Sequence, residues 1–381
     1  MKFSCTQENL RQGLFIVSHI ANRSVNLPIL ENVLIRTEEG GLKLMTTNLE
    51  MAISCAIRSK VESKGEFTVP SKLISDYVSL LPKDRVDVEQ IENSLSVSCG
   101  TYQTKLNGIG ASEFPLIPTV ESEHRFTVKV NALRKAIGQV NFAVAANESR
   151  PEISGVLFKF SLNSSIPYLV LAATDSYRLA EKSIDIDKVN GPQTEDSLSV
   201  IVPSRAVSEL VRILGVFKDT VDNPEKIDII VAENQIMFRY DQVELVSRTI
   251  DGKYPDYRQL IPESFETEAV IPKDELIRAV KATSLFSRTG LNDINVKFTA
   301  GATIGISANN PQTGEHRAEV EGEVTGKENS ITVNHRYLLD GLNNIETEKV
   351  MVQMIDGMSP CLLRQGTKGS EYLYIVMPIR Q

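Results

Sequence analysis

The side chains that most often perform catalysis or bind metals are few in this chain and widely separated. None of its histidines falls in an HExxH or similar zinc-ligand spacing, and none of its cysteines in a CxxC motif. These residues are His19, His124, His316 and His335, and Cys5, Cys55, Cys99 and Cys361. The chain also lacks a GxSxG elbow and a GxGxxG loop. We therefore expect a binding protein without metal or cofactor, with reduced thiols, rather than an enzyme.

A phosphate-binding loop is excluded, and an enzymatic site remains a weak alternative. The segment GEVTGKE at 322–328 has only three residues between its glycines and a glutamate after its lysine, so it does not fit a P-loop. An enzyme with a site between domains would have to use side chains such as Asp175 and Arg178. That hypothesis requires a cluster of groups with shifted pKa values.

Composition indicates a globular protein of more than one domain. The chain has 381 residues, of which 41% are hydrophobic and 24% charged, and the length favours two to three domains. No apolar run approaches the ~20 residues of a membrane span, and the N-terminus lacks the order of a signal peptide. We expect a cytoplasmic protein. The net charge of −8 argues against binding nucleic acid unless the charges are segregated.

One pattern of elements occurs three times along the chain. In each copy a β-type segment runs into an amphipathic helix, around Val69, Val202 and Val333. These valines are 133 and 131 residues apart, close to a third of the chain. The segments are FTVPSKLISDYVSLLP (67–82), VIVPSRAVSELVRILG (200–215) and ITVNHRYLLDGLNNI (331–345).

A second helix opens each copy, strand-like runs lie between the helices, and a hairpin closes it. The predicted helices are 6–20, 71–81, 131–146, 204–217, 273–288 and 335–344. Each copy therefore reads as an α+β domain with two helices packed on one face of an antiparallel sheet. The last apolar run, Tyr372 to Ile379, is the final strand of the third copy. The predicted domains are 1–122, 123–262 and 263–381.

Charge differs between the helices and the rest of the chain. The six predicted helices contain eleven lysines and arginines against six carboxylates, an excess of +5, so the remainder carries −13. An exposed helix face commonly carries such charges. A surface lined by all six helices would instead present cations to a phosphate backbone without reading bases.

The sequence resembles the bacterial β sliding clamp family, the processivity subunit of DNA polymerase III, over essentially its whole length. The resemblance rests on the order and spacing of short segments rather than on one motif. They are MKF at the start, LPIL (27–30), TNLEM (47–51), FTVPSK (67–72), ATDSYRLA (173–180), VIVPSR, DGKYPDYRQLIP (251–262), ISANNP (306–311) and VMPIR (376–380).

The resemblance implies three repeated domains per chain and a head-to-tail dimer closed into a ring, with helices lining a hole around duplex DNA. The protein would tether the replicative polymerase and other replication and repair proteins, without catalysis of its own. By position, the DNA-facing candidates are Arg23, Lys72, Asn147, Arg150, Arg205 and Arg212.

The family's partner site is a cleft between the second and third domains that accepts short peptides. Its users are the polymerase α subunit, the clamp-loader δ subunit, and repair and translesion polymerases. Carried over by position, the cleft residues are Ile153, Thr174, Ser176, Tyr177, Arg178, Leu179, Pro255, Gln259, Leu260, Asn334, Tyr337, Pro360, Ile375, Met377, Pro378, Ile379 and Arg380.

At the ring joint the resemblance places Leu285 and Phe286 against the partner's edge strand with Thr104 and Leu106. Some positions depart from the family pattern. Ser176-Tyr177 stands where Gly-His is expected, Gln259 replaces a basic residue, Gln381 an apolar one, and Thr104 an aromatic. A peptide-binding scaffold of the same fold that does not encircle DNA remains an alternative.

Overall fold

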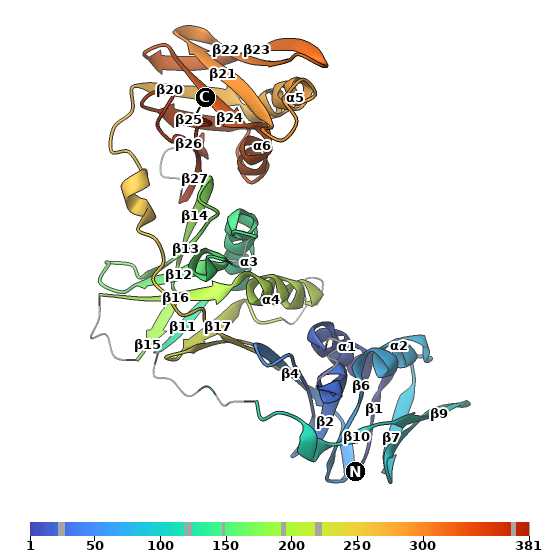
Figure 1. The fold of residues 1–381 in the computed structure, drawn as a ribbon. Helices are drawn as coiled ribbons and strands as arrows, with labels where there is room; N and C mark the ends of the chain where they lie inside the picture. Colours follow the sequence, from blue (N-terminus) through green and yellow to red (C-terminus); the bar gives the residue numbers. More distant parts are fainter. Residues whose placement is uncertain are drawn as a thin grey trace. The chain divides into compact units, whose positions relative to one another are not determined.

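The threefold pattern is present in the computed structural model as a threefold order of elements (Figure 1). The structure describes residues 1–21, 27–117, 120, 124–146, 149–191, 196–217, 223–366 and 371–380. Each repeat runs strand, helix, three strands, a further strand, helix, three strands, with one additional short strand before the second helix in the first and second repeats.

The elements of the first repeat are β1 (Lys2–Thr6), α1 (Gln7–Val17), β2 (Asn32–Glu38), β3 (Gly41–Thr47), β4 (Met51–Arg58), β5 (Lys60–Ser63), β6 (Glu66–Pro70), α2 (Ser71–Leu80), β7 (Arg85–Ile91), β8 (Ser94–Cys99) and β9 (Tyr102–Asn107), followed by β10 (Ile109–Gly110). Those of the second are β11 (His124–Lys129), α3 (Val130–Val140), β12 (Gly155–Ser161), β13 (Tyr168–Thr174), β14 (Arg178–Asp185), β15 (Lys188–Asn190), β16 (Ser197–Pro203), α4 (Ser204–Val216), β17 (Lys226–Val231), β18 (Gln235–Tyr240) and β19 (Val243–Arg248).

The third repeat contains β20 (Thr267–Pro272), α5 (Lys273–Ser284), β21 (Asp293–Thr299), β22 (Gly301–Asn310), β23 (Gly314–Gly326), β24 (Asn329–Asn334), α6 (His335–Asn343), β25 (Lys349–Met354), β26 (Cys361–Gln365) and β27 (Tyr372–Val376). Short 3-10 turns include η4 (Asn141–Ala143), η5 (Pro151–Ile153) and η6 (Tyr257–Leu260). None of the helices in the described ranges is long and apolar enough to cross a membrane.

The chain forms two compact units. The first comprises Met1–Asn131, Ile186–Thr194 and Ser208–Thr249, and the second Ala132–Asp185, Glu195–Val207 and Ile250–Gln381. The first unit holds a five-stranded sheet, β5-β1-β7-β8-β9, and a ten-stranded sheet, β10-β6-β2-β3-β4-β19-β18-β17-β11-β15. The second holds one twelve-stranded sheet, β16-β12-β13-β14-β27-β26-β25-β20-β23-β22-β21-β24. All pairings between strands are antiparallel, for example β1 with β7 and β12 with β13.

Two sheets, rather than the single sheet predicted, support the helices of the first repeat. Helices α1 and α2 lie side by side, and α1 contacts β1 of one sheet and β3 and β4 of the other (Figure 1). Leu10 and Leu14 of α1 are fully buried there, as the helical spacing of apolar residues requires. The α+β class with repeated pairs of helices on antiparallel sheets is confirmed.

Three predicted helices end earlier than expected. Helix α1 stops at Val17 and continues as the 3-10 turn η1 (Ser18–Ile20). Helix α3 stops at Val140 and continues only as the 3-10 turn η4, and α5 stops at Ser284. After α5 the backbone bonds span three residues, from Phe286 N to Thr283 O at 3.0 Å and from Ser287 N to Ser284 O at 3.2 Å. Arg288 then pairs with Asp293 at the start of β21. Apolar residues beyond these ends continue the helical spacing. Periodicity alone therefore could not distinguish a longer α-helix from a helix followed by a turn.

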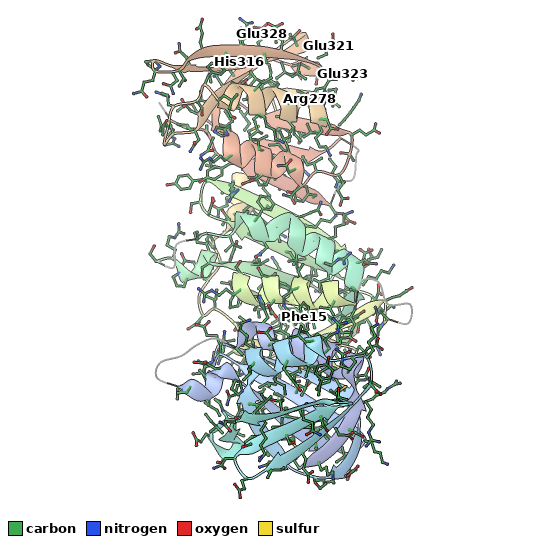
Figure 2. The ribbon with its side chains drawn as sticks, turned by 90° about the vertical axis from the view of Figure 1, so that its right-hand side faces the viewer. Phe15, Arg278, His316, Glu321, Glu323 and Glu328 are labelled. Atoms are coloured by element: carbon green, nitrogen blue, oxygen red, sulfur yellow. The ribbon has the colours of Figure 1, made fainter. Side chains whose placement is uncertain are left out.

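The edge of β23 is acidic and only partly paired. Residues 314–324 pair with β22, but only Glu323–Gly326 pair with β20 on the other side. Glu319, Glu321 and Glu323 are exposed at alternate positions, and Figure 2 shows Glu321 and Glu323 projecting from this strand.

Glycines at two helical positions have opposite consequences for stability. A Cβ at Gly341 in α6 would overlap the ring of Tyr374, whereas nothing lies within 4 Å of a Cβ at Gly138 in α3. We expect Gly341→Ala to destabilise the fold by about 1–3 kcal/mol through overpacking. Gly138→Ala is expected to stabilise it by up to about 1 kcal/mol. Thermal unfolding of both variants checks this, and equal shifts would contradict it.

Candidate functional site

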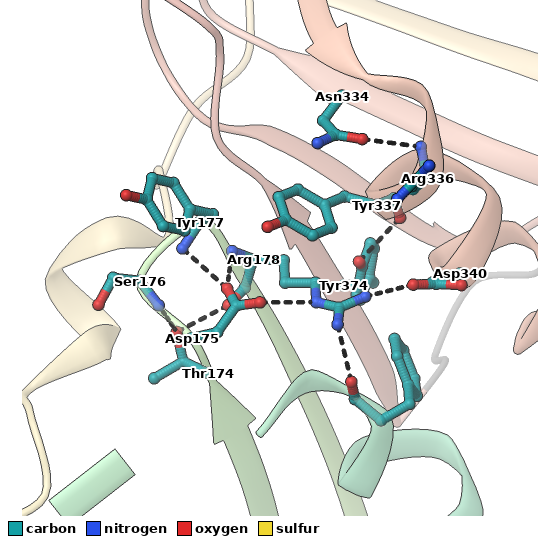
Figure 3. A network of polar contacts seen from close by, with 11 residues as sticks. Thr174, Asp175, Ser176, Tyr177, Arg178, Asn334, Arg336, Tyr337, Asp340 and Tyr374 are labelled. Atoms are coloured by element: carbon teal, nitrogen blue, oxygen red, sulfur yellow. Dashed lines mark hydrogen bonds and ion pairs between the residues drawn. The ribbon is translucent and has the colours of Figure 1, made fainter. Parts of the chain in front are cut away.

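A tight turn between β13 and β14 presents the residues predicted for a partner site (Figure 3). The Thr174 hydroxyl donates to the carbonyl of Arg178 at 2.7 Å, and the Asp175 carboxylate accepts from the backbone N–H of Tyr177 and Arg178 at 2.9 and 3.0 Å. Ser176 takes a left-handed backbone angle, φ 77°. The turn leaves the Tyr177 side chain 63% exposed.

Arg178 is fixed by partners from three elements. Its Nε donates to Asp175 at 3.0 Å, its Nη2 donates to the carbonyl of Phe142 in η4 at 2.9 Å, and its Nη1 pairs with Asp340 of α6. The guanidinium also lies 4.7 Å from the centre of the Tyr337 ring. Burial opposes its charge, but Tyr374, Asp175 and Asp340 outweigh burial and raise the pKa of Arg178. Arg178 therefore fixes the turn at 174–178 against η4 and α6, and these residues form one wall of the candidate site.

Aromatic side chains extend the wall toward the third repeat. The rings of Tyr177 and Tyr337 stack with centres 6.3 Å apart and an interplanar angle of 19° (Figure 3). The Tyr374 hydroxyl donates to the Tyr337 carbonyl at 2.8 Å, and burial raises the pKa of Tyr374 well above its usual value. The backbone N–H of Met377 donates to the carbonyl of Tyr177 at 2.9 Å. The end of β27 thus lies against this turn.

An apolar cluster lies beside the turn. Leu179 and Ile375 belong to it, and Met377 packs against it. The other members are Leu157, Ala172, Tyr257, Leu362 and Leu373, with Tyr254, Ile261 and Phe265 at its margin. Sequence reasoning did not single out Tyr257, which is 5% exposed and donates its hydroxyl to Glu181. Its place in the segment DGKYPDYRQLIP was the available signal.

The remaining cleft candidates lie in the second unit in varied settings. Ile153 is 2% exposed, Asn334 caps α6 by accepting from Arg336 N at 2.9 Å, and Ile379 N donates to Thr332 O at 2.8 Å. Pro255, Pro360 and Pro378 are half-buried, whereas Leu260, Gln259 and Arg380 are exposed. Within the described ranges, no hydrogen bond ties Gln259, Pro360 or Arg380 to the other candidates. Gln259 donates instead to Asp256, at 2.9 Å.

The predicted DNA-facing residues have different local partners. Lys72 of α2 is exposed and pairs with Asp76 at 2.9 Å. Arg150 donates to Glu152 at 3.1 Å and to the Ser176 hydroxyl at 2.8 Å. Arg205 lies exposed on α4, whereas Arg23 and Asn147 lie outside the described residues.

The guanidinium of Arg212 is occupied by intramolecular partners. It donates to Glu209 at 2.8 Å and to the carbonyls of Phe15 and Ile16 at 3.3 and 2.5 Å. Glu209 is 4% exposed and also contacts His19 at 2.6 Å. These bonds join α4 to the end of α1.

Sequence reasoning did not include Arg336 among the DNA-facing candidates. Aligned on Val69, Val202 and Val333, the repeats place Lys72, Arg205 and Arg336 at one position of α2, α4 and α6. Arg336 is exposed like the other two. The repeat alignment itself was the signal.

The predicted joint residues lie in different units, Thr104 and Leu106 in the first and Leu285 and Phe286 in the second. Leu106 is buried and Thr104 half-buried on β9, the outermost strand of the five-stranded sheet. Leu285 is 75% exposed just after α5, and Phe286 stacks on His316 with ring centres 5.4 Å apart. Two apolar residues of α2 that were not among the predicted joint residues, Leu73 and Leu80, are 52% and 79% exposed.

No group of three or more His, Cys, Asp or Glu that could hold a metal occurs among the described residues. Burial raises the pKa of Cys5, Cys55 and Cys361 to about 12. Such thiols are unreactive. The surface around the turn at 174–178 therefore offers apolar contact, stacking and backbone hydrogen bonding.

Removing the Arg178 guanidinium should weaken the contact between β14, η4 and α6. We expect Arg178→Met to destabilise the second unit by about 3 kcal/mol, because Asp175 is left as an unpaired, largely buried carboxylate. The matched change Asp340→Asn removes a half-exposed partner and should cost less than about 1 kcal/mol. Denaturant unfolding of both variants measures the difference. Equal losses would show that Asp175 needs no counterion.

Comparison with known proteins places this geometry in one family. Profiles described as the N-terminal, central and C-terminal domains of the DNA polymerase III beta subunit match residues 1–118, 127–256 and 258–380. The chain is 30% identical to a beta sliding clamp of Bacillus subtilis over 393 residues, covering 100% of both, and 30% identical to one of Staphylococcus aureus over 365 residues, covering 93% and 92%.

Solved structures agree with the sequence matches. The sliding clamp of B. subtilis has a TM-score of 0.91 at 27% identity, covering 100% of this chain and 99% of that one. A Pseudomonas aeruginosa DNA polymerase III subunit beta bound to griselimycin has a TM-score of 0.91 at 29% identity, with 100% of both covered. By three successive domain matches, full-length identity and fold, the chain belongs to the family of the DNA polymerase III beta subunit, the beta sliding clamps.

Proposed function

We propose that this protein is a DNA sliding clamp that closes as a head-to-tail homodimeric ring around duplex DNA and tethers the replicative polymerase. It has no catalytic step of its own, because its role is to hold a polymerase on DNA. The observation that carries the proposal is that one strand pairing joins successive repeats, and that among the described residues the first and third repeats each keep one strand, β9 and β23, with an edge open for the same pairing.

The strand pairing that joins repeats occurs twice within the chain. The strand β4 of the first repeat pairs with β19, the last strand of the second, and β14 of the second pairs with β27, the last strand of the third. By the same rule β23 of the third repeat requires the last strand of a first repeat, β9. In the described ranges β9 has one edge without a strand partner, and the edge of β23 opposite β22 is unpaired except at Glu323–Gly326. A second copy of the chain supplies the missing strand, and the pairing closes because it is heterologous.

The helices lead to the same partner arrangement. Leu285 occupies the position after α5 that His19 occupies after α1 and Phe142 after α3. His19 contacts Glu209 of α4, and Phe142 contacts Arg178 beside α6. Glu209 and Asp340 align with Asp76 of α2, which pairs with Lys72 of its own helix. We infer that Leu285 meets α2 of the second subunit, where Leu73 and Leu80 are exposed.

Duplex DNA is the partner that fits the cationic helices. Lys72, Arg205 and Arg336 recur at one helical position. Arg23, Asn147, Arg150 and Arg212 complete the proposed set, and Arg212 would contact phosphate while it keeps its bonds to Glu209 and the α1 carbonyls. Phosphate contacts of this kind carry no sequence information, so a closed ring can slide.

The peptide site is proposed around the turn at 174–178 and the end of β27. Its exposed Tyr177, half-buried Met377 and the neighbouring apolar cluster suit a short peptide with apolar anchors. The partners are the replicative polymerase α subunit, the clamp-loader δ subunit, and repair and translesion polymerases. We propose domains 1–122, 123–262 and 263–381 and a cytoplasmic location.

A charge on α2 should open the dimer. We expect Leu80→Asp to weaken dimerisation by about 10- to 100-fold, because it removes apolar burial worth about 1.5–3 kcal/mol. Light scattering at submicromolar concentration measures the mass, and Ile166→Asp, also at an exposed apolar residue (60% exposed), is the control. Negative-stain averages of the unmodified protein should show closed six-lobed rings. Compact or open particles would favour a scaffold that does not encircle DNA.

The repeated cations should set the salt dependence of DNA binding. Replacing Lys72, Arg205 and Arg336 by alanine is expected to weaken binding to any duplex sequence and to lower the slope of log affinity against log salt by about 0.9 for each phosphate that is no longer neutralised. Fluorescence anisotropy with a labelled duplex at several salt concentrations measures the slope. Alanine at Lys60, Lys64 and Lys188, cations outside the helices and away from β23 and β9, should leave it unchanged. An unaltered slope in the first variant would exclude these phosphate contacts.

A further inference from the structure

The turn between β3 and β4 repeats the turn at 174–178 bond for bond. The Thr47 hydroxyl donates to the Met51 carbonyl at 2.9 Å, and the Asn48 side chain accepts from the backbone N–H of Glu50 and Met51 at 3.1 and 2.8 Å. Leu49 has the same left-handed angle as Ser176, φ 75°. Even the contact from the last strand is repeated, since Arg248 N donates to the Glu50 carbonyl at 2.9 Å, as Met377 N does to Tyr177.

The strands beside the two turns have the same register. Ala52 pairs with Val246 as Leu179 pairs with Ile375, and Leu34 pairs with Met45 as Leu157 pairs with Ala172. Each of these members of the apolar cluster beside Tyr177 therefore has an apolar counterpart in the first unit. Leu362 corresponds to Met237, because they pair with Ile375 and Val246 respectively.

These counterparts line a cavity of about 540 Å³ within the first unit. Leu34, Met45, Ala52, Met237 and Val246 contribute strand side chains, and Phe114 and Ile117 come from the segment that follows β10. Phe114 is 9% exposed and packs on Leu30, Leu34 and Met45, so it occupies part of the surface. The remaining volume lies within the usual range for small-ligand and peptide-anchor pockets, ~300–1,000 Å³.

The fold does not by itself require an apolar surface at this position. The third repeat has the same strand register, with Asn295 paired to Ser307 and Asn309 to Glu315. Its corresponding cavity is lined mostly by polar residues, which include these four, Arg317 and Thr332, with Ile294, Ala308 and Pro311 as its apolar members. The apolar lining in the first unit is thus a property of this repeat's own residues.

The charges around the first-unit cavity are paired with one another. Arg36 meets Glu66 at 2.8 Å, and Glu244 meets Lys43 at 3.3 Å and Arg239 at 3.0 Å. With Glu38, the cavity has three cations and three carboxylates, so it offers no net charge to an acidic or basic partner. Leu116, which lines the cavity, is 97% exposed, and Leu49 of the turn between β3 and β4 is 47% exposed. Exposed apolar groups around an uncharged hollow favour a neutral, apolar occupant.

We propose that this cavity is a second docking groove, which takes one aliphatic or aromatic anchor of a short, extended peptide from a partner protein. The groove rests on the proposed function for its partner class, since it copies the frame of the site at Tyr177. Its two methionines, Met45 and Met237, adapt their shape to either kind of anchor. A clamp with both sites offers each bound partner a second, weaker contact. While one contact is made, the effective concentration of the partner's other segment at its own site is raised.

Methionine methyl groups report the two sites separately. The chain has eight methionines, of which Met45 and Met237 line the groove and Met377 borders the site at Tyr177. Full-length protein labelled with ¹³C at methionine methyls is titrated with acetyl-Ser-Leu-Phe-amide, and acetyl-Ser-Ser-Ser-amide is the control probe. Met45→Leu, Met237→Leu and Met377→Leu assign the signals. We expect saturable shifts at Met45 and Met237, with a dissociation constant different from that at Met377.

The outcomes separate the two proposals. Shifts at Met45 and Met237 alone would support the groove and contradict the site at Tyr177. Shifts at Met377 alone would overturn the groove and leave the other site, and a response at neither would overturn both. Leu116→Ser should weaken groove binding about fivefold and leave Met377 unaffected, since one apolar contact of ~1 kcal/mol is removed. Leu291→Ser, at another exposed leucine (46% exposed), should change neither constant. Equal effects of the two serine variants would also overturn the groove.

Discussion

Backbone pairing between repeats is the interaction on which this structure depends. At each internal joint, five residue pairs connect the third strand of the sheet in one repeat to the last strand of the next. The pairing is made of main-chain hydrogen bonds, so it tolerates wide variation of side chains while it fixes register. Each pairing also brings together the turn before the joining strand, the end of the next repeat's last strand and the segment that connects two repeats. Both apolar surfaces described above arise at that place.

The repeat and most helices could be predicted from the sequence, because apolar spacing around Val69, Val202 and Val333 is strong and local. The joining strands could not. The runs interpreted as strands between the helices end at Glu50, Tyr177 and Pro311, before β4, β14 and β23. The closing hairpins were placed from Ser94, Gln235 and Cys361 onward, so β7, β17 and β25 were also missed. Their partners are far away in sequence, and nothing in a local pattern indicates which edge a strand will join. The early ends of α3 and α5 have the same origin, since turns and the Arg288–Asp293 pair overrode helical spacing.

The sequence predicted which residues belong to the candidate site better than it predicted what each of them does there. Resemblance named Arg178 and Tyr177 together, but only the contacts distinguish a buried guanidinium that positions the wall from an exposed ring that offers contact. Charge counting had a similar limit. Arg212 is bonded to α1 carbonyls, and Lys273 donates to the carbonyl of Ile345 at 2.9 Å. A count of cations on helices cannot separate those that hold the fold from those that face solvent.

The acidic side chains of β23 matter for a chain that has not yet paired with a second copy. An open strand edge is a template for indiscriminate pairing, and identical edges are the commonest wrong partners in a concentrated solution of one protein. Glu319 and Glu321 would face their own copies if two such edges met, and like charges directly opposite disfavour that pairing. The edge of β9 instead exposes Lys105, whose opposite charge disfavours pairing of two β9 edges and favours pairing of β9 with β23. A newly made chain is thereby protected from aggregating with its neighbours while its correct counterpart remains acceptable.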